Sequence, residues 1–208
     1  MAATSMRKLP RLGGLAAVGV CWWLAVGSAS GQEQAAKAPA DRPLRRSDGL
    51  KVEPGGELRS YLDAVSKKWL TPAPDANPAI LAMFADRDRK PYRDLLPWSG
   101  EFAGKYLTGA SKVYQATDDA ELKRRLQDFV ERLLPLQDVD GYLGPFAKAH
   151  RLTGNAPNIQ GKPGPTWDAW GHYHMMLGLL AWHDAVGDPA ALVAAEKIGD
   201  LLDRKSVV

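Results

Sequence analysis

A helical hairpin occurs twice in this sequence at a spacing of 69 residues, and this repeat limits the possible folds more than any other feature. In each copy two segments with helical periodicity flank a short turn, at 117–119 and at 187–189. Ala185, just before the second turn, lies 69 residues after Ala116. A helix pair that repeats at a fixed period is typical of an array in which each unit packs on its neighbours. The four segments are 99–116, 120–136, 166–186 and 190–202.

The two helices of each hairpin differ in polarity. Segments 120–136 and 190–202 place apolar residues on one side and charged residues on the other, whereas segment 166–186 is apolar almost all round. A helix without a polar face is expected to be buried on all sides. We therefore expect the first helices to form a buried inner layer and the second helices an outer one. Long links rich in Pro and Gly favour a closed α/α toroid over an open superhelix.

The rest of the body is also expected to be helical. Apolar residues recur every three or four positions from 58 to 69, which predicts an amphipathic helix that ends at the proline-rich segment 71–74. Prolines leave room for a short helix near 79–85. Ser99 is a plausible N-cap for the helix that follows it. No segment alternates with a period of two, so no strand is expected.

The N-terminal segment has the features of a secretory signal peptide. A basic start is followed by an apolar run over 15–26 and by small residues at 27–31. The run is shorter than the about 20 residues of a membrane-spanning helix. We interpret residues 1–31 as a signal peptide and 32–56 as a flexible linker, and we expect a periplasmic or secreted protein without membrane attachment after cleavage.

Length sets the extent of the domain. A toroid of six hairpins, at roughly 60–70 residues each, needs about 400 residues, whereas this chain has 208. The expected fold is therefore all-α, with helical hairpin repeats that form an incomplete part of an (α/α)6 toroid over 57–208. We expect these helices to pack against the C-terminal half of that domain, which this chain does not contain.

Composition excludes several classes of function. The net charge of +3 falls to about zero without the three basic residues of the leader, and there is no basic stripe, so nucleic acid is not an expected partner. Cys21 is the single cysteine, and it lies in the leader. The remaining chain therefore has no disulfide, no thiol nucleophile and no thiolate metal ligand.

Three stretches carry a resemblance to a known family. They are Trp98-Ser99-Gly100-Glu101-Phe102, then Gln137-Asp138-Val139-Asp140-Gly141-Tyr142-Leu143, then Gly171-His172-Tyr173-His174. In this order they resemble the N-terminal half of glycoside hydrolase family 127, the β-L-arabinofuranosidase-like proteins, over about residues 90–203.

The resemblance implies an (α/α)6 catalytic domain followed by β-sandwich modules. It also implies retaining hydrolysis of arabinofuranosyl glycans by a zinc-bound cysteine nucleophile and a glutamate acid/base, all downstream of this region. We therefore assign no catalytic residue, metal ligand or cofactor to this chain, although zinc is expected in the complete domain. Whether the chain is itself an enzyme stays open.

The candidate site residues are substrate contacts. His174 matches the substrate-cradling histidine of the family, and the loop with Asp140 and Tyr142 matches a rim of the sugar pocket. His174 shares a helix face with Trp170 and Gly178, which offers stacking, hydrogen bonding and space. In order, the candidates are His174, Trp170, Tyr142, Asp140, Glu101 and His172.

Each candidate has a structural alternative. His174 is otherwise a packed core histidine, Asp140 a turn residue, and Glu101 a carboxylate at the positive end of a helix. His172 forms an i, i+4 pair with Asp168 that also suits a helix start. His172 and His174 do not suggest a metal site, because two helical positions differ by about 200°.

The sequence thus leaves several functions open. Our first interpretation is that the chain is the N-terminal segment of an exported glycoside hydrolase and contributes substrate contacts. The alternatives are a truncated, non-catalytic paralogue or sugar-binding fragment, and a zinc-independent α/α-toroid hydrolase or lyase.

Overall fold

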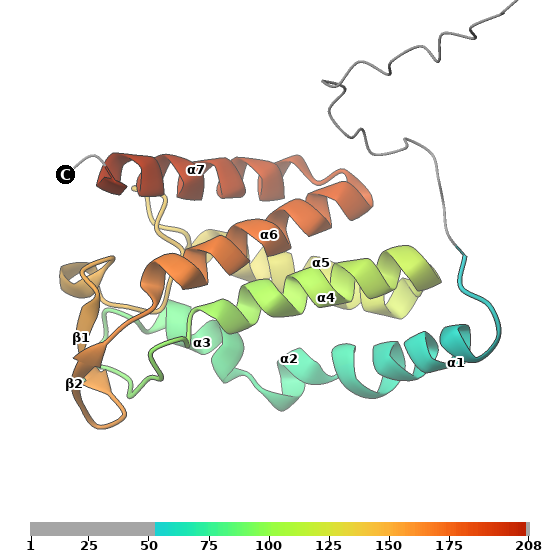
Figure 1. Ribbon diagram of the computed structural model, residues 1–208, viewed down its shortest axis with the longest axis horizontal. Helices are drawn as coiled ribbons and strands as arrows, with labels where there is room; N and C mark the ends of the chain where they lie inside the picture. The colour runs from blue at the N-terminus through green and yellow to red at the C-terminus, as the bar shows by residue number, and fades with distance from the viewer. Residues whose placement is uncertain (1–52, 207–208) are drawn as a thin grey trace, which may run out of the picture. The chain divides into compact units, whose positions relative to one another are not determined.

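The computed structural model describes residues 53–206, which form helices joined by loops and one small sheet (Figure 1). The predicted signal peptide and most of the predicted linker lie outside these residues. None of the described helices is long and apolar enough to cross a membrane. The helices are α1 (Gly56–Val65), continued by the π-helical turn η1 (Ser66–Leu70), α2 (Ala73–Ala76), α3 (Ala79–Ala85), α4 (Glu101–Thr117), α5 (Ala120–Leu133), α6 (Asp168–Val186) and α7 (Pro189–Ser206).

Both predicted hairpins are present, and their turns use the same chemistry. Asp118, with φ of 54°, ends α4, and the Asp119 carboxylate caps α5 by accepting hydrogen bonds from two amides at 3.0 and 3.2 Å. Gly187, with φ of 75°, ends α6, and Asp188 caps α7 with contacts of 2.9 and 3.4 Å. Left-handed residues and carboxylate caps are common helix ends. The 69-residue repeat therefore holds at the level of single turn residues.

The inner helices α4 and α6 lie side by side, because glycines let their backbones meet (Figure 1). A Cβ atom on Gly104 would lie 2.3 Å from the carbonyl carbon of His174, and one on Gly178 would lie 2.6 Å from the carbonyl oxygen of Gly104. The expectation that Gly178 leaves space for a ligand is therefore wrong, since Gly104 fills that space.

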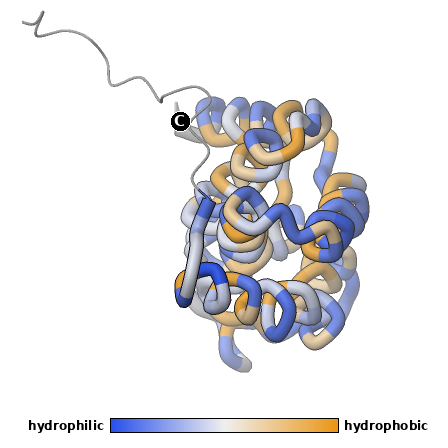
Figure 2. Tube along the Cα trace, turned by 90° about the vertical axis from the view of Figure 1, so that its right-hand side faces the viewer, coloured by the Kyte–Doolittle hydropathy of each residue, from blue (hydrophilic) through white to orange (hydrophobic). Residues whose placement is uncertain are grey.

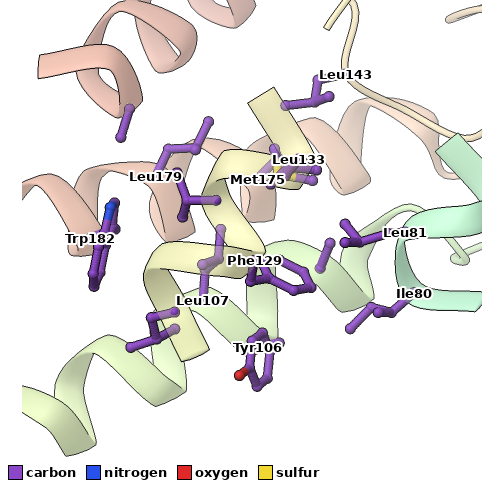
Figure 3. Close-up of a cluster of buried hydrophobic side chains, with 14 of the residues drawn as sticks. Ile80, Leu81, Tyr106, Leu107, Phe129, Leu133, Leu143, Met175, Leu179 and Trp182 are labelled. Atoms are coloured by element: carbon purple, nitrogen blue, oxygen red, sulfur yellow. The ribbon is translucent and has the colours of Figure 1, made fainter. Parts of the chain in front are cut away.

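The apolar core lies between α4, α5 and α6 (Figure 3). The apolar stripe of α5 is buried, as expected for an amphipathic helix. It packs against Leu107 of α4 and against Met175 and Leu179 of α6. In the view along the helices, hydrophobic and hydrophilic residues alternate around the coils (Figure 2). Each fully buried Leu or Phe stabilises the fold by about 1.5–3 kcal/mol. The stripe of α5 consists of Leu122, Leu126, Phe129, Val130 and Leu133.

The predicted layers need one correction. The inner helices α4 and α6 each bury eight residues, and the outer helix α5 buries five. However, α6 is not enclosed on all sides, because large apolar residues on one face are 38–52% exposed. Contacts to this face come from Glu101 of α4 and from Trp98, both near the start of α6. The exposed residues are Trp167, Trp170, Tyr173, Leu177 and Leu180.

A small antiparallel hairpin, β1 (Asn155–Ile159) and β2 (Lys162–Pro165), contradicts the expectation that no strand occurs. Its two turn residues, Gln160 and Gly161, have φ of 54° and 77°, as in the two-residue turns that suit a twisted hairpin. Three prolines in the strands remove the usual sequence signal for a strand. The hairpin is held by Leu95, which exchanges backbone hydrogen bonds with β1 and the turn.

The start of α4 also differs from expectation. The N-cap of α4 is Gly100, and the Ser99 hydroxyl instead accepts a hydrogen bond from the amide of Leu96 at 2.9 Å. Ser99 therefore shapes the loop before α4 and does not cap the helix. In contrast, α3 has the bounds that the prolines predicted.

Candidate functional site

Glu101 is the centre of a polar cluster at the N-terminal ends of α4 and α6. Its carboxylate is buried and accepts a hydrogen bond of 2.5 Å from the indole Nε1 of Trp170 and one of 2.6 Å from Lys105 Nζ. As the first residue of α4, Glu101 also lies where the helix dipole favours a negative charge. The two donors and the helix dipole offset the cost of burying this carboxylate.

His174 lies one helical turn from Trp170 and beside the same carboxylate. Its Nε2 atom is 4.0 Å from Glu101 Oε2, and its ring meets that of Trp170 edge-on at 4.7 Å. Nε2 is buried and has no hydrogen-bond partner among the described residues. An unpaired buried polar atom costs about 1–3 kcal/mol, which a ligand hydroxyl at this point would relieve.

Burial lowers the pKa of His174, and the Lys105 cation lowers it further, while the Glu101 carboxylate acts in the opposite direction. The imidazole is therefore neutral at pH 7. A neutral imidazole either donates or accepts a hydrogen bond at Nε2, depending on its tautomer. This suits a hydroxyl group, which can take both roles.

Aromatic faces surround this cluster and are open to solvent. The ring of Trp170 stacks on Tyr173 at 5.4 Å and is about half exposed, and Trp167 packs against Trp98 at 5.4 Å. A hollow of about 290 Å³ lies against Trp167 and Trp170. Flat apolar faces beside a few fixed polar groups are the usual composition of small-ligand sites.

Tyr142 belongs to a second cluster, which is buried. Its hydroxyl lies 3.0 and 3.1 Å from the two carboxylate oxygens of Asp168, to which it donates, and it accepts a hydrogen bond of 3.1 Å from the amide of Phe146. Burial, and next the charge of Asp168, raise the pKa of Tyr142 well above its ordinary value of 10.0. Asp168 also accepts a hydrogen bond from the amide of Leu152 at 2.9 Å. Tyr142 thus holds the loop that follows α5 onto the start of α6.

His172 has the same holding role. Its Nδ1 lies 2.9 Å from the carbonyl oxygen of Asp168, and its Nε2 lies 3.2 Å from the amide of Leu143. Because an amide can only donate, Nε2 must accept, so His172 is neutral with its proton on Nδ1. Its side chain is 1% exposed and contacts Tyr142, whereas His174 contacts Trp170. The two histidines therefore face different surroundings, as their spacing predicted.

Asp140 lies at the edge of the buried cluster. It accepts a hydrogen bond from the amide of Tyr142 at 3.0 Å, and its other oxygen is 3.4 Å from Arg151. Arg151 is buried over the ring of Tyr142 and pairs with Asp138 at 2.7 Å. This ion pair lowers the pKa of Asp138. Ion pairs between Arg151 and the carboxylates of Asp138 and Asp140 thus hold the loop after α5 in place.

The six sequence candidates therefore fall into two groups. Glu101, Trp170 and His174 meet in one cluster that is partly open to solvent. Tyr142 and His172 are buried beneath the loop, with Asp140 at its edge. Contact of these three with a ligand stays a prediction.

Sequence reasoning did not single out Lys105 or Tyr173. A signal for the cluster was available, because Glu101 and Trp170 are separated by the repeat length of 69 residues. Equivalent positions of neighbouring hairpins are expected to lie side by side in such an array.

No group of three or more His, Cys, Asp or Glu side chains within residues 53–206 could hold a metal ion. The zinc site that the family resemblance implies was expected downstream of this region, and the described residues offer no ligand set for it.

Paired helices with a 69-residue repeat, adjacent inner helices and a carboxylate–tryptophan–histidine cluster at their N-terminal ends define part of an α/α toroid. The model of the family described as β-L-arabinofuranosidase, GH127 catalytic domain, matches residues 66–207. The chain belongs to this family. Comparison with curated protein sequences gives no match.

Two solved structures share this fold. The first is Ara127N-Se, a GH127 β-L-arabinofuranosidase from Geobacillus stearothermophilus T6, with a TM-score of 0.58 and 17% identity over 73% of this chain and 25% of that one. The second is BT3674, a GH127 β-arabinofuranosidase, with a TM-score of 0.57 and 19% identity over 74% of this chain and 26% of that one. The chain thus spans about a quarter of the length of either structure.

Proposed function

We propose that this chain is the N-terminal segment of an exported glycoside hydrolase that acts on arabinofuranosyl-containing glycans, and that it supplies substrate contacts. The observation that carries the proposal is the cluster of Glu101, Trp170 and His174. It combines a fixed carboxylate acceptor, an exposed indole face and an imidazole nitrogen that has no hydrogen-bond partner among residues 53–206. Membership of the GH127 family supports a carbohydrate as the ligand.

Each of the three side chains has a defined part in binding. The Trp170 ring stacks on the apolar face of the sugar, while its Nε1 keeps Glu101 in place. Glu101 accepts a hydrogen bond from one hydroxyl, and His174 Nε2 bonds to another. None of them is assigned to bond cleavage, which ordinarily needs two catalytic groups on either side of the scissile bond.

Titration of the purified chain with methyl β-L-arabinofuranoside, followed by tryptophan fluorescence, tests the proposal. We expect saturable binding that Trp170→Ala abolishes and that Tyr61→Ala, an exposed aromatic residue on α1, leaves unchanged. Circular dichroism would confirm that both variants are folded. The proposal would be contradicted if methyl glucopyranoside bound with the same affinity as the arabinofuranoside. It would also be contradicted if folded Trp170→Ala kept the affinity of the parent chain.

Export is a separate part of the proposal and rests on the pattern of residues 1–31. Expression of the whole chain in a bacterium with a general secretion pathway should give a product outside the cytoplasm. Its mass should correspond to cleavage between residues 29 and 32. A cytoplasmic product with an intact N-terminus would overturn this part alone.

A further inference from the structure

A second hollow, which we call the aromatic groove, lies next to the Glu101 cluster. It runs between η1, α2 and α3 on one side and α4 on the other, and it has a volume of about 480 Å³. Its walls are mostly apolar and include Trp69, Phe102, Ile80 and Tyr106. Trp69 is 67% exposed and Phe102 is 39% exposed, so both rings offer open faces to a ligand.

The charged groups that line the aromatic groove are both positive. Lys68 and Lys105 contribute ammonium groups, and no carboxylate is among its lining residues. Lys68 forms no ion pair with any residue in the described part of the chain. Asp75, on α2, is paired with Arg125 at 2.7 Å. The groove therefore favours a ligand with a flat apolar face and a negative charge.

Lys105 connects the aromatic groove to the Glu101 cluster. Its Nζ donates to Glu101 Oε1 at 2.6 Å, and the same side chain lines the groove. An ammonium group has three donors, so this contact leaves others for a ligand. A glycan whose next unit lies in the aromatic groove would thus meet Lys105 from the side opposite to Glu101.

From this continuity of charge and shape we infer that the aromatic groove is a subsite for an acidic sugar unit, whose ring stacks on Trp69 and Phe102 and whose carboxylate is held by Lys68 and Lys105. The inference rests on the proposed function and narrows it, because the glycan would carry a uronic acid next to its arabinofuranosyl unit. A neutral sugar leaves the charge of Lys68 unused, and an aliphatic acid leaves the aromatic faces without a stacking partner.

Calorimetric titration of the full chain with trigalacturonate and with its fully methyl-esterified form isolates the charge on one sugar skeleton. We expect the acid to bind at least about fivefold more tightly at low salt. Lys68→Gln should weaken acid binding about three- to fivefold, the size of an exposed ion pair, and leave the ester unchanged. Trp69→Ala should weaken both ligands equally.

Lys112→Gln is the matched control, because Lys112 lies on the same face of α4, two turns beyond Lys105, and does not line the groove. It should leave binding of both ligands unchanged. Equal affinity for acid and ester, an equal effect of Lys112→Gln and Lys68→Gln, or equal binding of hexanoate would each overturn the inference.

The two proposals fail in different ways. Binding of methyl β-L-arabinofuranoside without any preference for the acid would reject the acidic subsite and leave the proposed function intact. Lysine-dependent binding of trigalacturonate without any binding of the arabinofuranoside would reject the proposed function, and with it the composite glycan.

Discussion

Trp98 and Trp167 are 69 residues apart in the sequence, and their ring centroids are 5.4 Å apart in the structure. Each precedes the inner helix of its hairpin, so the repeat places equivalent residues next to each other at one end of the array. The Glu101–Trp170 hydrogen bond has the same spacing. The Glu101–Trp170 cluster is thus a consequence of how neighbouring hairpins align.

Gly104→Ala should destabilise the protein by at least about 2 kcal/mol. The new methyl group would lie 2.3 Å from the backbone of His174, so α4 and α6 would have to separate. Gly109→Ala is the control on the same helix, because its methyl group would meet nothing within 4 Å. A helical Gly replaced by Ala there should add about 0.5–1 kcal/mol of stability. Thermal melts compare the two, and equal melting temperatures would refute close helix contact.

Tyr142→Phe should cost about 1–3 kcal/mol of stability, because it leaves the amide of Phe146 without an acceptor and takes one donor from Asp168. Tyr114→Phe changes the same group on a half-buried tyrosine and should change stability by less than about 0.5 kcal/mol. Urea unfolding measures both. If Tyr142→Phe has the same free energy of unfolding as the parent protein, the buried cluster does not hold the loop.

The Asp138–Arg151 pair should make stability depend on pH. The hydrogen bond from Arg151 lowers the pKa of Asp138 below its ordinary value of 3.8. A carboxylate whose pKa is lower in the folded state stabilises it above the unfolded pKa, and this contribution is lost as the pH falls through the folded value. Asp138→Asn should therefore destabilise the protein more at pH 7 than near pH 2. Unfolding curves at both pH values check this, and an equal loss at both would contradict it.

The purified chain should not hydrolyse a chromogenic arabinofuranoside, with or without added zinc. Cys21 is its single cysteine, within the predicted leader, and no metal-binding group occurs over 53–206. Release of the chromophore by a homogeneous preparation, abolished by Glu101→Gln, would show that this segment carries chemistry of its own.

Sequence periodicity was sufficient for α4, α5, α6 and α7, because apolar stripes such as that of α5 report directly on the core. It did not predict α2, which lies in the proline-rich segment expected to end the first helix. It could not show that one face of α6 is exposed, since an apolar residue has the same sequence signal whether or not a neighbour covers it. The hairpin of β1 and β2 was missed for a different reason. Its prolines suppress the strand pattern, and its register depends on Leu95, some 60 residues earlier in the chain.

The site was predictable only in part. Helical spacing predicts that Trp170 and His174 share a face. The burial of His172 and Tyr142, however, depends on how the loop after α5 folds back over α6. Gly178 shows the limit of helical spacing, because its partner Gly104 belongs to another hairpin. A glycine can leave space for a ligand or allow the backbone of a neighbouring helix to approach, and the sequence does not distinguish these two roles.

We propose that His174 recognises a sugar hydroxyl and is not a core residue. In parallel titrations with methyl β-L-arabinofuranoside, His174→Ala should bind about tenfold more weakly, the loss of a hydrogen bond with its partner left unpaired, while its melting temperature moves by only a few degrees. His183→Ala is the control near the other end of α6, where Nδ1 lies 2.8 Å from the carbonyl oxygen of Asp188, and it should bind like the parent. If His174→Ala instead unfolds the protein while the affinity of the folded fraction is unchanged, the claim is wrong.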